Sequence, residues 1–204
     1  MKRRKALLLA AAASLALTAG LCGCDKYGGW GNPGTAASGV ESGTKISLNS
    51  SLPDVHSFTA GTIGGGSYTE SLLASADVTV INIWQTTCPP CIKEMPDLAL
   101  LEGNLPDNVQ LLTWCLDGSY NNAKAKQILS EAGFGGETII SWSGDLDKLL
   151  EKIMYTPTTV FLDSEGNMVC EEIIGSGDVI TKYTEHINAA LRAMGKDEIR
   201  LGQT

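Results

Sequence analysis

The chain has 204 residues, of which 43% are hydrophobic, and its formal net charge is −8. This length accommodates one medium-sized domain with a targeting or linker segment, and the hydrophobic content excludes a globally disordered chain. The acidic balance argues against a nucleic-acid partner, because binding to phosphates requires a basic face. The six cysteines fall into two close pairs and two singles, so the chain is not a dense disulfide scaffold.

The first 23 residues have the pattern of an export signal. Basic residues 2–5 precede an apolar stretch, residues 6–19, which is shorter than the roughly 20 residues of a membrane-spanning helix. Residues 21–24, Leu-Cys-Gly-Cys, resemble a bacterial lipoprotein box, which implies removal of a 1–23 signal peptide and lipidation of Cys24. Cleavage by an ordinary signal peptidase and an uncleaved anchor are the alternatives. In each case we expect an extracytoplasmic protein, which the lipid would place on the extracytoplasmic face of a bacterial cell membrane.

The mature chain is more acidic than the whole sequence. Removal of residues 1–23 takes away four basic residues and no acidic one, so the net charge becomes −12. An anionic leaflet repels such a chain, and the lipid on Cys24 would therefore be its membrane attachment. Residues 24–51 are rich in glycine, serine and threonine without periodicity, which predicts a flexible tether. The folded domain is predicted to span residues 52–204.

Strand patterns and helix patterns alternate along this domain. The continuous apolar, β-branched run 78–84 is typical of a central strand that is buried on both faces. The predicted strands are 78–84, 109–116, 137–141, 158–163 and 168–174. Helices are predicted after Cys88 with Pro96 inside, at 121–132, from an N-cap at Asp145 onward, and at 180–194. This order, which ends in a hairpin and a helix, predicts an α/β three-layer sandwich with a mixed sheet.

The sequence Cys88-Pro-Pro-Cys91 follows the first predicted strand and opens a helix. The helix dipole and the free N–H groups of the first turn stabilise a thiolate, which predicts that Cys88 is a nucleophile. Cys91, one turn later, can attack a mixed disulfide and release the product. Pro89 and Pro90 cost little, because N–H groups in a first turn have no intrahelical partner. An inert structural disulfide and a zinc ligand pair are the alternatives, although zinc needs about four ligands and the chain has one CxxC motif and two distant histidines.

Residues 52–194 resemble the TlpA-like, ResA-type extracytoplasmic branch of the thioredoxin superfamily. The matching motifs, in order, are Asn82-Ile-Trp84, Cys88-Pro-Pro-Cys91, Glu94-Met-Pro96 and Thr156-Pro157 through Asp163, followed by Gly166. The resemblance implies a thioredoxin fold with a strand-helix insertion, formed here by the predicted helix at 121–132 and the predicted strand at 137–141. It also implies a thiol-disulfide oxidoreductase that uses no cofactor beyond the redox-active Cys88–Cys91 disulfide.

The resemblance implies roles for the residues of the predicted active-site loop. Cys88 is similar to the family's attacking cysteine and Cys91 to its resolving cysteine. Thr87, Pro89 and Pro90 complete the loop. Proteins of this family commonly reduce protein disulfides with electrons from a membrane thiol donor, so we expect protein thiols and disulfides as partners of a chain that is monomeric and binds no metal.

A carboxylate and a proline complete the implied site. Pro157 is similar to a cis-proline that faces the dithiol, and Thr156 before it would offer backbone groups to a substrate. Glu94 is similar to the family's acidic residue. A carboxylate there can accept the Cys91 proton and raise the pKa values of the thiols. The alternative is an exposed glutamate that the helix dipole favours in the first turn.

The remaining cysteines are predicted not to pair. In the resembled fold Cys115 and Cys170 lie on strands with two others between them, roughly 14 Å apart at about 4.8 Å per strand. A disulfide requires Cα atoms within about 7 Å, so we expect two small buried hydrophobic residues. A second redox relay is the alternative.

The alternatives on the same fold are a copper-binding or metallochaperone-type module and a peroxidase. A copper-binding or metallochaperone-type module would have a longer cysteine spacing and a distant histidine as third ligand, and neither His56 nor His186 stands in such a context. A peroxidase would require a threonine three residues before the attacking cysteine, where the chain has Gln85.

Overall fold

The computed structural model describes residues 46–201, so the predicted signal peptide, Cys24 and most of the predicted tether lie outside the described residues. The strands are β1 (Phe58–Thr62), β2 (Ser67–Thr69), β3 (Val78–Trp84), β4 (Val109–Cys115), β5 (Thr138–Gly144), β6 (Thr158–Asp163) and β7 (Ile173–Ile174). The helices are the 3₁₀ helix η1 (Glu70–Ser75) and the α-helices α1 (Pro89–Glu102), α2 (Asn122–Ala132), α3 (Asp145–Leu150) and α4 (Val179–Ala193). Within this part of the chain, no helix combines the length and the hydropathy of a membrane span.

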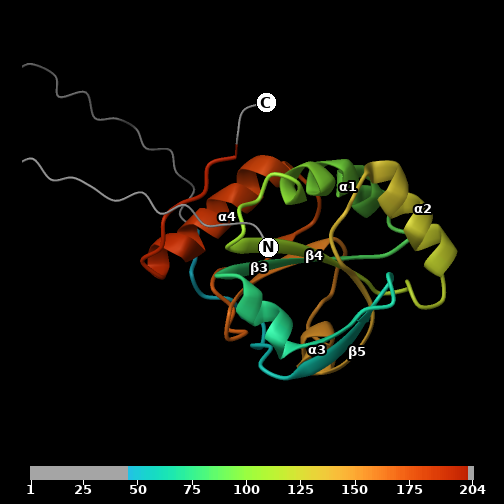
Figure 1. Cartoon of the computed structure of the whole chain (residues 1–204), viewed down its shortest axis with the longest axis horizontal. Coiled ribbons are helices and arrows are strands. Elements are labelled where there is room, and N and C mark those ends of the chain that lie inside the picture. The colour runs from blue at the N-terminus through green and yellow to red at the C-terminus, as the bar shows by residue number, and fades with distance from the viewer. Residues whose placement is uncertain (1–45, 202–204) are drawn as a thin grey trace, which may run out of the picture. The chain divides into compact units, whose positions relative to one another are not determined.

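The strands form one mixed sheet in the order β2-β1-β5-β4-β3-β6-β7. Strands β3, β4 and β5 are parallel, whereas β6 and β1 run antiparallel to their neighbours β3 and β5. Helices α1, α2 and α4 cover one face of the sheet, and α3 lies on the other (Figure 1). The predicted α/β three-layer fold with a mixed sheet is therefore confirmed.

Strand β3 is the centre of the core, and all seven of its residues are buried. Alternate side chains point to opposite faces of a strand, so Val80 and Trp84 pack with the helices α1 and α4, while Ile81 and Ile83 pack with α3. Burial of each large apolar side chain stabilises the fold by about 1.5–3 kcal/mol. The apolar run that predicted a strand buried on both faces is thus explained by helices on both sides.

The first part of the domain contains structure that the sequence pattern does not predict. Strand β1 pairs with β5 and β2 pairs with β1, which adds two strands to one edge of the sheet, and η1 follows. Only alternate residues of β1 are buried, and glycines at 61 and 64–66 interrupt the strand pattern there. The long-range pairing with β5, and not local preference, stabilises these strands.

The strand predicted at 168–174 is wrong in its length. Apart from one bridge between Leu162 and Met168, only Ile173–Ile174 pairs with β6. The reason is a competing contact, because the backbone N–H of Glu171 donates to the carbonyl oxygen of Ser47 at 2.9 Å. Residues 46–51, which the sequence assigns to the end of the tether, thus lie against the segment before β7.

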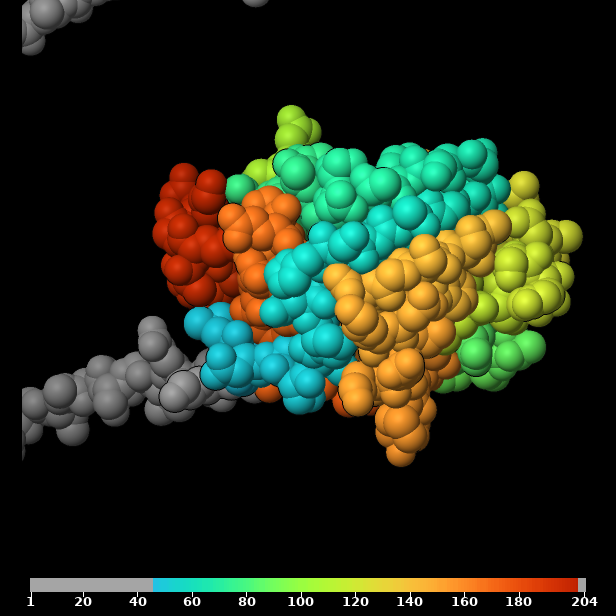
Figure 2. All heavy atoms as spheres, turned by 90° about the horizontal axis from the view of Figure 1, so that it is seen from below, coloured from blue at the N-terminus to red at the C-terminus, as the bar shows by residue number. Residues whose placement is uncertain are grey.

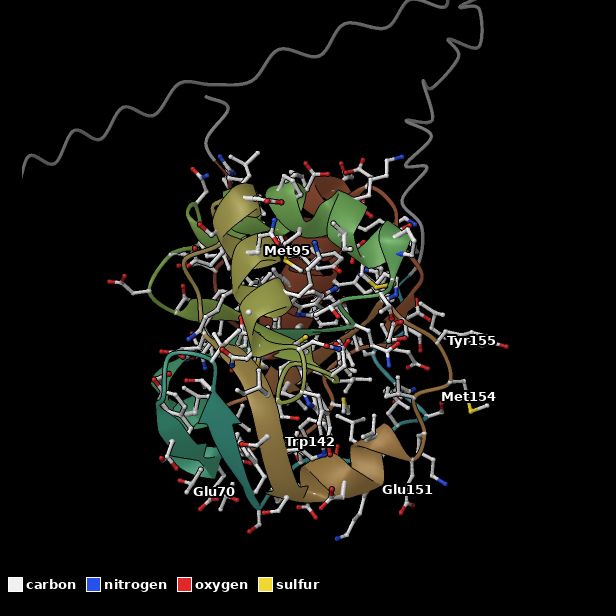
Figure 3. All side chains as sticks on the ribbon, turned by 90° about the vertical axis from the view of Figure 1, so that its right-hand side faces the viewer. Glu70, Met95, Trp142, Glu151, Met154 and Tyr155 are labelled. Atoms are coloured by element: carbon white, nitrogen blue, oxygen red, sulfur yellow. A yellow bond between two sulfur atoms is a disulfide. The ribbon has the colours of Figure 1, made fainter. Side chains whose placement is uncertain are left out.

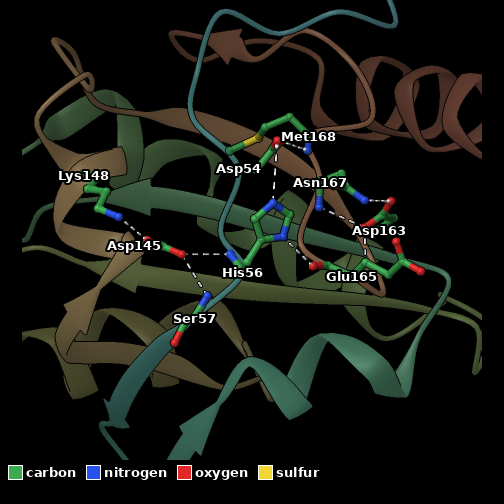
Figure 4. A network of polar contacts seen from close by, with 9 residues as sticks. All are labelled: Asp54, His56, Ser57, Asp145, Lys148, Asp163, Glu165, Asn167 and Met168. Carbon is green, nitrogen blue, oxygen red and sulfur yellow. Dashed lines mark hydrogen bonds and ion pairs between the residues drawn. The ribbon is translucent and has the colours of Figure 1, made fainter.

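The entry into β1 is held by a polar network (Figure 4). The Asp145 carboxylate accepts hydrogen bonds from the backbone N–H groups of His56 and Ser57 at 3.1 and 2.9 Å, and it pairs with Lys148 at 2.7 Å. The prediction that Asp145 is the N-cap of its helix is wrong, because Gly144 takes that position without a side-chain bond. Asp145 instead uses its carboxylate to hold a distant segment.

Gly166 closes the turn between β6 and the segment that leads to β7. Its φ of +89° lies in the left-handed region, and a side chain there would collide with the carbonyl oxygen of Val55. The backbone N–H of Val55 donates to the Gly166 carbonyl oxygen at 2.8 Å. The close approach of these two backbones therefore explains why the turn has glycine at this position.

Candidate active site

The dithiol lies where the central strand meets its first helix. Cys88 is the N-cap of α1, with extended φ and ψ of −98° and 99°, and Pro89 and Pro90 occupy the first helical positions. The sulfur of Cys88 accepts a hydrogen bond from the backbone N–H of Cys91 at 3.3 Å. A disulfide joins Cys88 to Cys91, with their Cα atoms 5.3 Å apart. Cys88 keeps 9% of its surface exposed and Cys91 none, so only Cys88 is open to attack from solution.

The loop before β6 faces this disulfide. The Thr156–Pro157 peptide bond is cis, and the Thr156 carbonyl oxygen lies 3.5 Å from the Cys88 sulfur. Thr87, Pro89 and Pro90, which flank Cys88 in the sequence, are exposed, and so are Met154 and Tyr155, which immediately precede Thr156. The structure thus brings Cys88, Cys91, Thr156 and Pro157 together, as the sequence predicts.

Glu94 lies one helical turn after Cys91 and is 5% exposed, so it is not the exposed first-turn glutamate of the alternative prediction. Burial raises the pKa of Glu94 to about 7, the nearby Asp97 also raises it, and a hydrogen bond from Asn82 opposes both. Glu94 lines a cavity of about 320 Å³ together with Pro90, Lys93, Asp97, Ser176 and Gly177. A buried carboxyl with a pKa near neutrality and a route to solvent can exchange protons with a neighbouring thiol.

A buried amide reaches Glu94 from the central strand. The Asn82 side-chain N–H group donates to the Glu94 carboxylate at 3.0 Å, and the hydroxyl oxygens of Thr159 and Tyr183 lie 3.0 and 3.1 Å from the same nitrogen. Asn82 and Thr159 are cross-strand partners on β3 and β6, and Tyr183 comes from α4. The apolar stripe of the last helix predicts that Tyr183 packs in the core, but not that its hydroxyl meets this site.

Asp117, which is not among the predicted site residues, holds the loop that precedes the dithiol. Its carboxylate accepts hydrogen bonds from the backbone N–H of Thr86 at 2.9 Å, from the Thr86 hydroxyl and from the Asn121 amide. Burial opposes the charge, but these hydrogen bonds lower the pKa of Asp117. An acid two residues after β4, at the edge where β3 also ends, is the signal that could have found it.

Cys115 and Cys170 are buried free cysteines, as predicted, and the strands β3 and β6 lie between β4 and β7. Cys170 lies before β7 and not on a strand, which corrects its predicted position. Burial raises the pKa of the Cys170 thiol to about 12, and burial together with the neighbouring Asp117 raises the pKa of Cys115 well above its usual range. Thiols that do not ionise near neutral pH are poor nucleophiles, which favours packing over a second relay.

Within residues 46–201, no three histidine, cysteine or acidic side chains lie close enough together to share a metal ion. The groups that the described site brings together are the Cys88–Cys91 disulfide and the buried Glu94 carboxyl, whose pKa is raised to about 7.

Comparison with known proteins identifies the fold. The sequence matches no protein-family model and no curated protein. Among solved structures, StoA from Bacillus subtilis is 23% identical with a TM-score of 0.53, and the match covers 65% of this chain and 98% of StoA. The thioredoxin domain of a thiol-disulfide oxidoreductase from Bacteroides vulgatus is 18% identical with a TM-score of 0.55, and the match covers 69% of this chain and 100% of that domain.

A third solved structure is an exposed lipoprotein thioredoxin from Streptococcus pneumoniae. It is 22% identical with a TM-score of 0.50, and the match covers 62% of this chain and 96% of the pneumococcal chain. Similarity at these identities establishes the fold, and the predicted thioredoxin fold is confirmed. The neighbours include proteins described as thiol-disulfide oxidoreductases.

Proposed function

We propose that this chain is a membrane-tethered, extracytoplasmic thiol-disulfide oxidoreductase that reduces protein disulfides through Cys88 and Cys91. The observation that carries the proposal is the arrangement at the start of α1. One sulfur is accessible at the helix N-terminus, its partner is buried behind it, and a carboxyl of raised pKa lies one turn further on. A purely structural disulfide would require neither an accessible sulfur nor a buried acid.

The proposed reaction is two successive thiol-disulfide exchanges. The Cys88 thiolate attacks one sulfur of the substrate disulfide, forms a mixed disulfide and releases the other substrate sulfur as a thiolate. Cys91 then gives its proton to Glu94, and its thiolate attacks the Cys88 sulfur and releases the second substrate thiolate. Two electrons pass from the dithiol to the substrate, whose thiolates take up protons from water. A membrane thiol donor would return the Cys88–Cys91 disulfide to the dithiol.

One feature supports the reducing direction. A dithiol protein is a strong oxidant when its reduced, thiolate form is stabilised. The Glu94 carboxylate adds a negative charge on the same helix, and a like charge near a thiol disfavours its thiolate.

Protein substrates, as opposed to small disulfides, are supported by the surface beside Cys88. Met154 is 77% exposed and Tyr155 is 68% exposed, and both point away from the fold (Figure 3). The segment around them forms a protrusion in the space-filling view (Figure 2). With the exposed Ile174 and with Thr158 they line a cavity of about 120 Å³. An apolar segment that flanks a substrate cysteine would cover these side chains when its sulfur reaches Cys88.

We therefore expect the double substitution Met154→Ser and Tyr155→Ser to lower kcat/KM for a protein disulfide about tenfold, because two apolar contacts are lost. The rate with a small aromatic disulfide should not change. The control is Leu100→Ser, which removes an apolar side chain that is 52% exposed about three turns along α1 from the dithiol. Equal losses for both kinds of disulfide, or the same loss in the control, would contradict a protein-docking role.

The membrane tether is supported by the lipoprotein-box pattern at residues 21–24 and by the pneumococcal structural neighbour, which is described as an exposed lipoprotein. In a bacterial host, Cys24→Ser should abolish labelling with a radioactive fatty acid and cause the uncleaved precursor to accumulate, because the lipid has no thiol to which it can be attached. The neighbouring substitution Cys22→Ser should change neither result. Labelling that persists without Cys24 would place the lipid elsewhere.

A further inference from the structure

The hydrogen-bond donors and acceptors around the Asn82 side chain do not match in number. A side-chain amide carries two hydrogens, yet three acceptors face the Asn82 nitrogen: a Glu94 carboxylate oxygen and the hydroxyl oxygens of Thr159 and Tyr183. The Asn82 carbonyl oxygen is fully buried and has no partner in the described part of the chain. Such an oxygen destabilises the fold. The contacts of the amide nitrogen therefore explain the orientation of this amide, because its oxygen accepts no hydrogen bond in the described part of the chain.

We propose that Asn82 is a positioning residue for Glu94, and that Thr159 and Tyr183 fix its amide so that it donates a hydrogen bond to the ionised carboxylate. One hydrogen goes to the carboxylate and the other to the pair of hydroxyl groups, which are themselves hydrogen-bonded to each other. If the amide were reversed, its oxygen would face a carboxylate oxygen at about the same 3.0 Å separation, which is repulsive unless Glu94 is protonated.

The network residues are buried, whereas Glu94 also lines the cavity with Lys93 and Asp97. Asn82 and Thr159 are held in register by the antiparallel pairing of β3 and β6, and the Tyr183 ring packs edge-on against Phe161 at 6.0 Å. All three network residues are buried. The network can therefore stabilise the charge of Glu94 without contact with solvent, while a proton leaves through the cavity.

Other charged and titratable groups also lie near Glu94. Asp97 and Lys93 come from α1 and line the same cavity, and Tyr183 reaches the network from α4. Burial and the Glu94 charge raise the pKa of Tyr183, so its hydroxyl stays neutral while Glu94 titrates. Only the role of Cys91, as the source of the proton that Glu94 receives, rests on the proposed function.

The test is the titration of Glu94 in the oxidised full chain, followed by the carboxyl-carbon NMR signal of labelled glutamate and assigned with Glu94→Gln. Asn82→Leu should move the midpoint upward by about one to two pH units, because a hydrogen bond to the charged form is lost. Tyr183→Phe and Thr159→Val should each move it upward by less. These two variants keep the apolar parts of their side chains, so they test the proposal even if Asn82→Leu does not fold.

The matched control is Thr113→Val. Thr113 is the β4 neighbour of Asn82 and is also buried, but its hydroxyl is hydrogen-bonded to Thr138. Thr113→Val should lower the free energy of unfolding as Thr159→Val does, but it should not move the midpoint of the Glu94 titration. An unchanged midpoint in the folded Asn82 and Tyr183 variants, or an equal shift in the control, would overturn the proposal. Because this titration requires no turnover, an inert dithiol would contradict the proposed function and leave the positioning role standing.

Discussion

Replacement of Cys91 by serine should convert the protein into a trap for its substrates. Cys88 would still attack a substrate disulfide, but no second thiolate would resolve the mixed disulfide, so turnover should fall by at least about 10³-fold. The buried position of Cys91 and the exposure of the Cys88 sulfur are the physical reasons for this division of roles. The trapped species is measured by non-reducing electrophoresis and mass spectrometry of the bond at Cys88.

Two further variants show whether the trap is specific. Cys88→Ser should trap nothing and should lose turnover, because the remaining thiol has no exposed surface. Cys115→Ser, which changes a buried free cysteine on β4, should leave turnover intact and trap nothing. Disulfide reduction that persists in Cys88→Ser, or mixed disulfides that form through Cys115, would be incompatible with the proposed mechanism.

Glu94→Gln should change both activity and stability. A neutral amide cannot accept the Cys91 proton, so we expect the rate of the resolving step to fall about 10²-fold. In the native protein that rate should rise with pH through about 7, as Glu94 ionises, and in the variant this limb should be absent. Single-turnover kinetics between pH 5 and 9 measure the resolving step directly.

Glu94→Gln should also raise the stability of the protein, and this gain should depend on pH. The pKa of Glu94 is raised in the folded state to about 7 from its ordinary 4.5, so its contribution to stability is full below 4.5 and is lost as pH rises through 7. The loss is about 3 kcal/mol at higher pH, which Glu94→Gln removes. We expect a Tm about 5–10 °C above that of the native protein at pH 8 and little difference at pH 4.

The control for both effects is Glu102→Gln, at the end of the same helix, where the side chain is only partly buried. It should alter neither the pH profile of the resolving step nor the difference in Tm between pH 4 and pH 8. A Glu94→Gln protein that is no more stable at pH 8 than the native chain would mean that the carboxyl is not held in a buried, desolvated position.

The features that could be predicted from the sequence are those with a local cause. The run 78–84 is apolar at every position except Thr79 and Asn82, and the Cys88–Cys91 spacing matches one turn of a helix that opens with two prolines. Hydrophobic periodicity and helix-terminus chemistry are sufficient in both cases. The fold class and the dithiol follow from them.

The features that the sequence did not predict depend on distant partners. Strand β1 exists because β5 pairs with it, and Asp145 binds the backbone of His56 and Ser57 instead of capping its own helix. Tyr183 has the spacing of a core residue, and only the packing of α4 against β3 brings its hydroxyl to Asn82. Local preference carries no information on such contacts, which tertiary structure determines.

The central claim, that Cys88 and Cys91 are a redox-active pair with reducing character, is tested most directly by their reduction potential. The purified full chain is equilibrated in glutathione and dithiothreitol buffers, and its thiols are alkylated and counted by mass spectrometry. We expect one two-electron transition at Cys88 and Cys91 between about −180 and −270 mV. A pair that stays oxidised below about −300 mV would be a structural disulfide, and a midpoint near −120 mV would belong to an oxidant. Either result would contradict the proposed function.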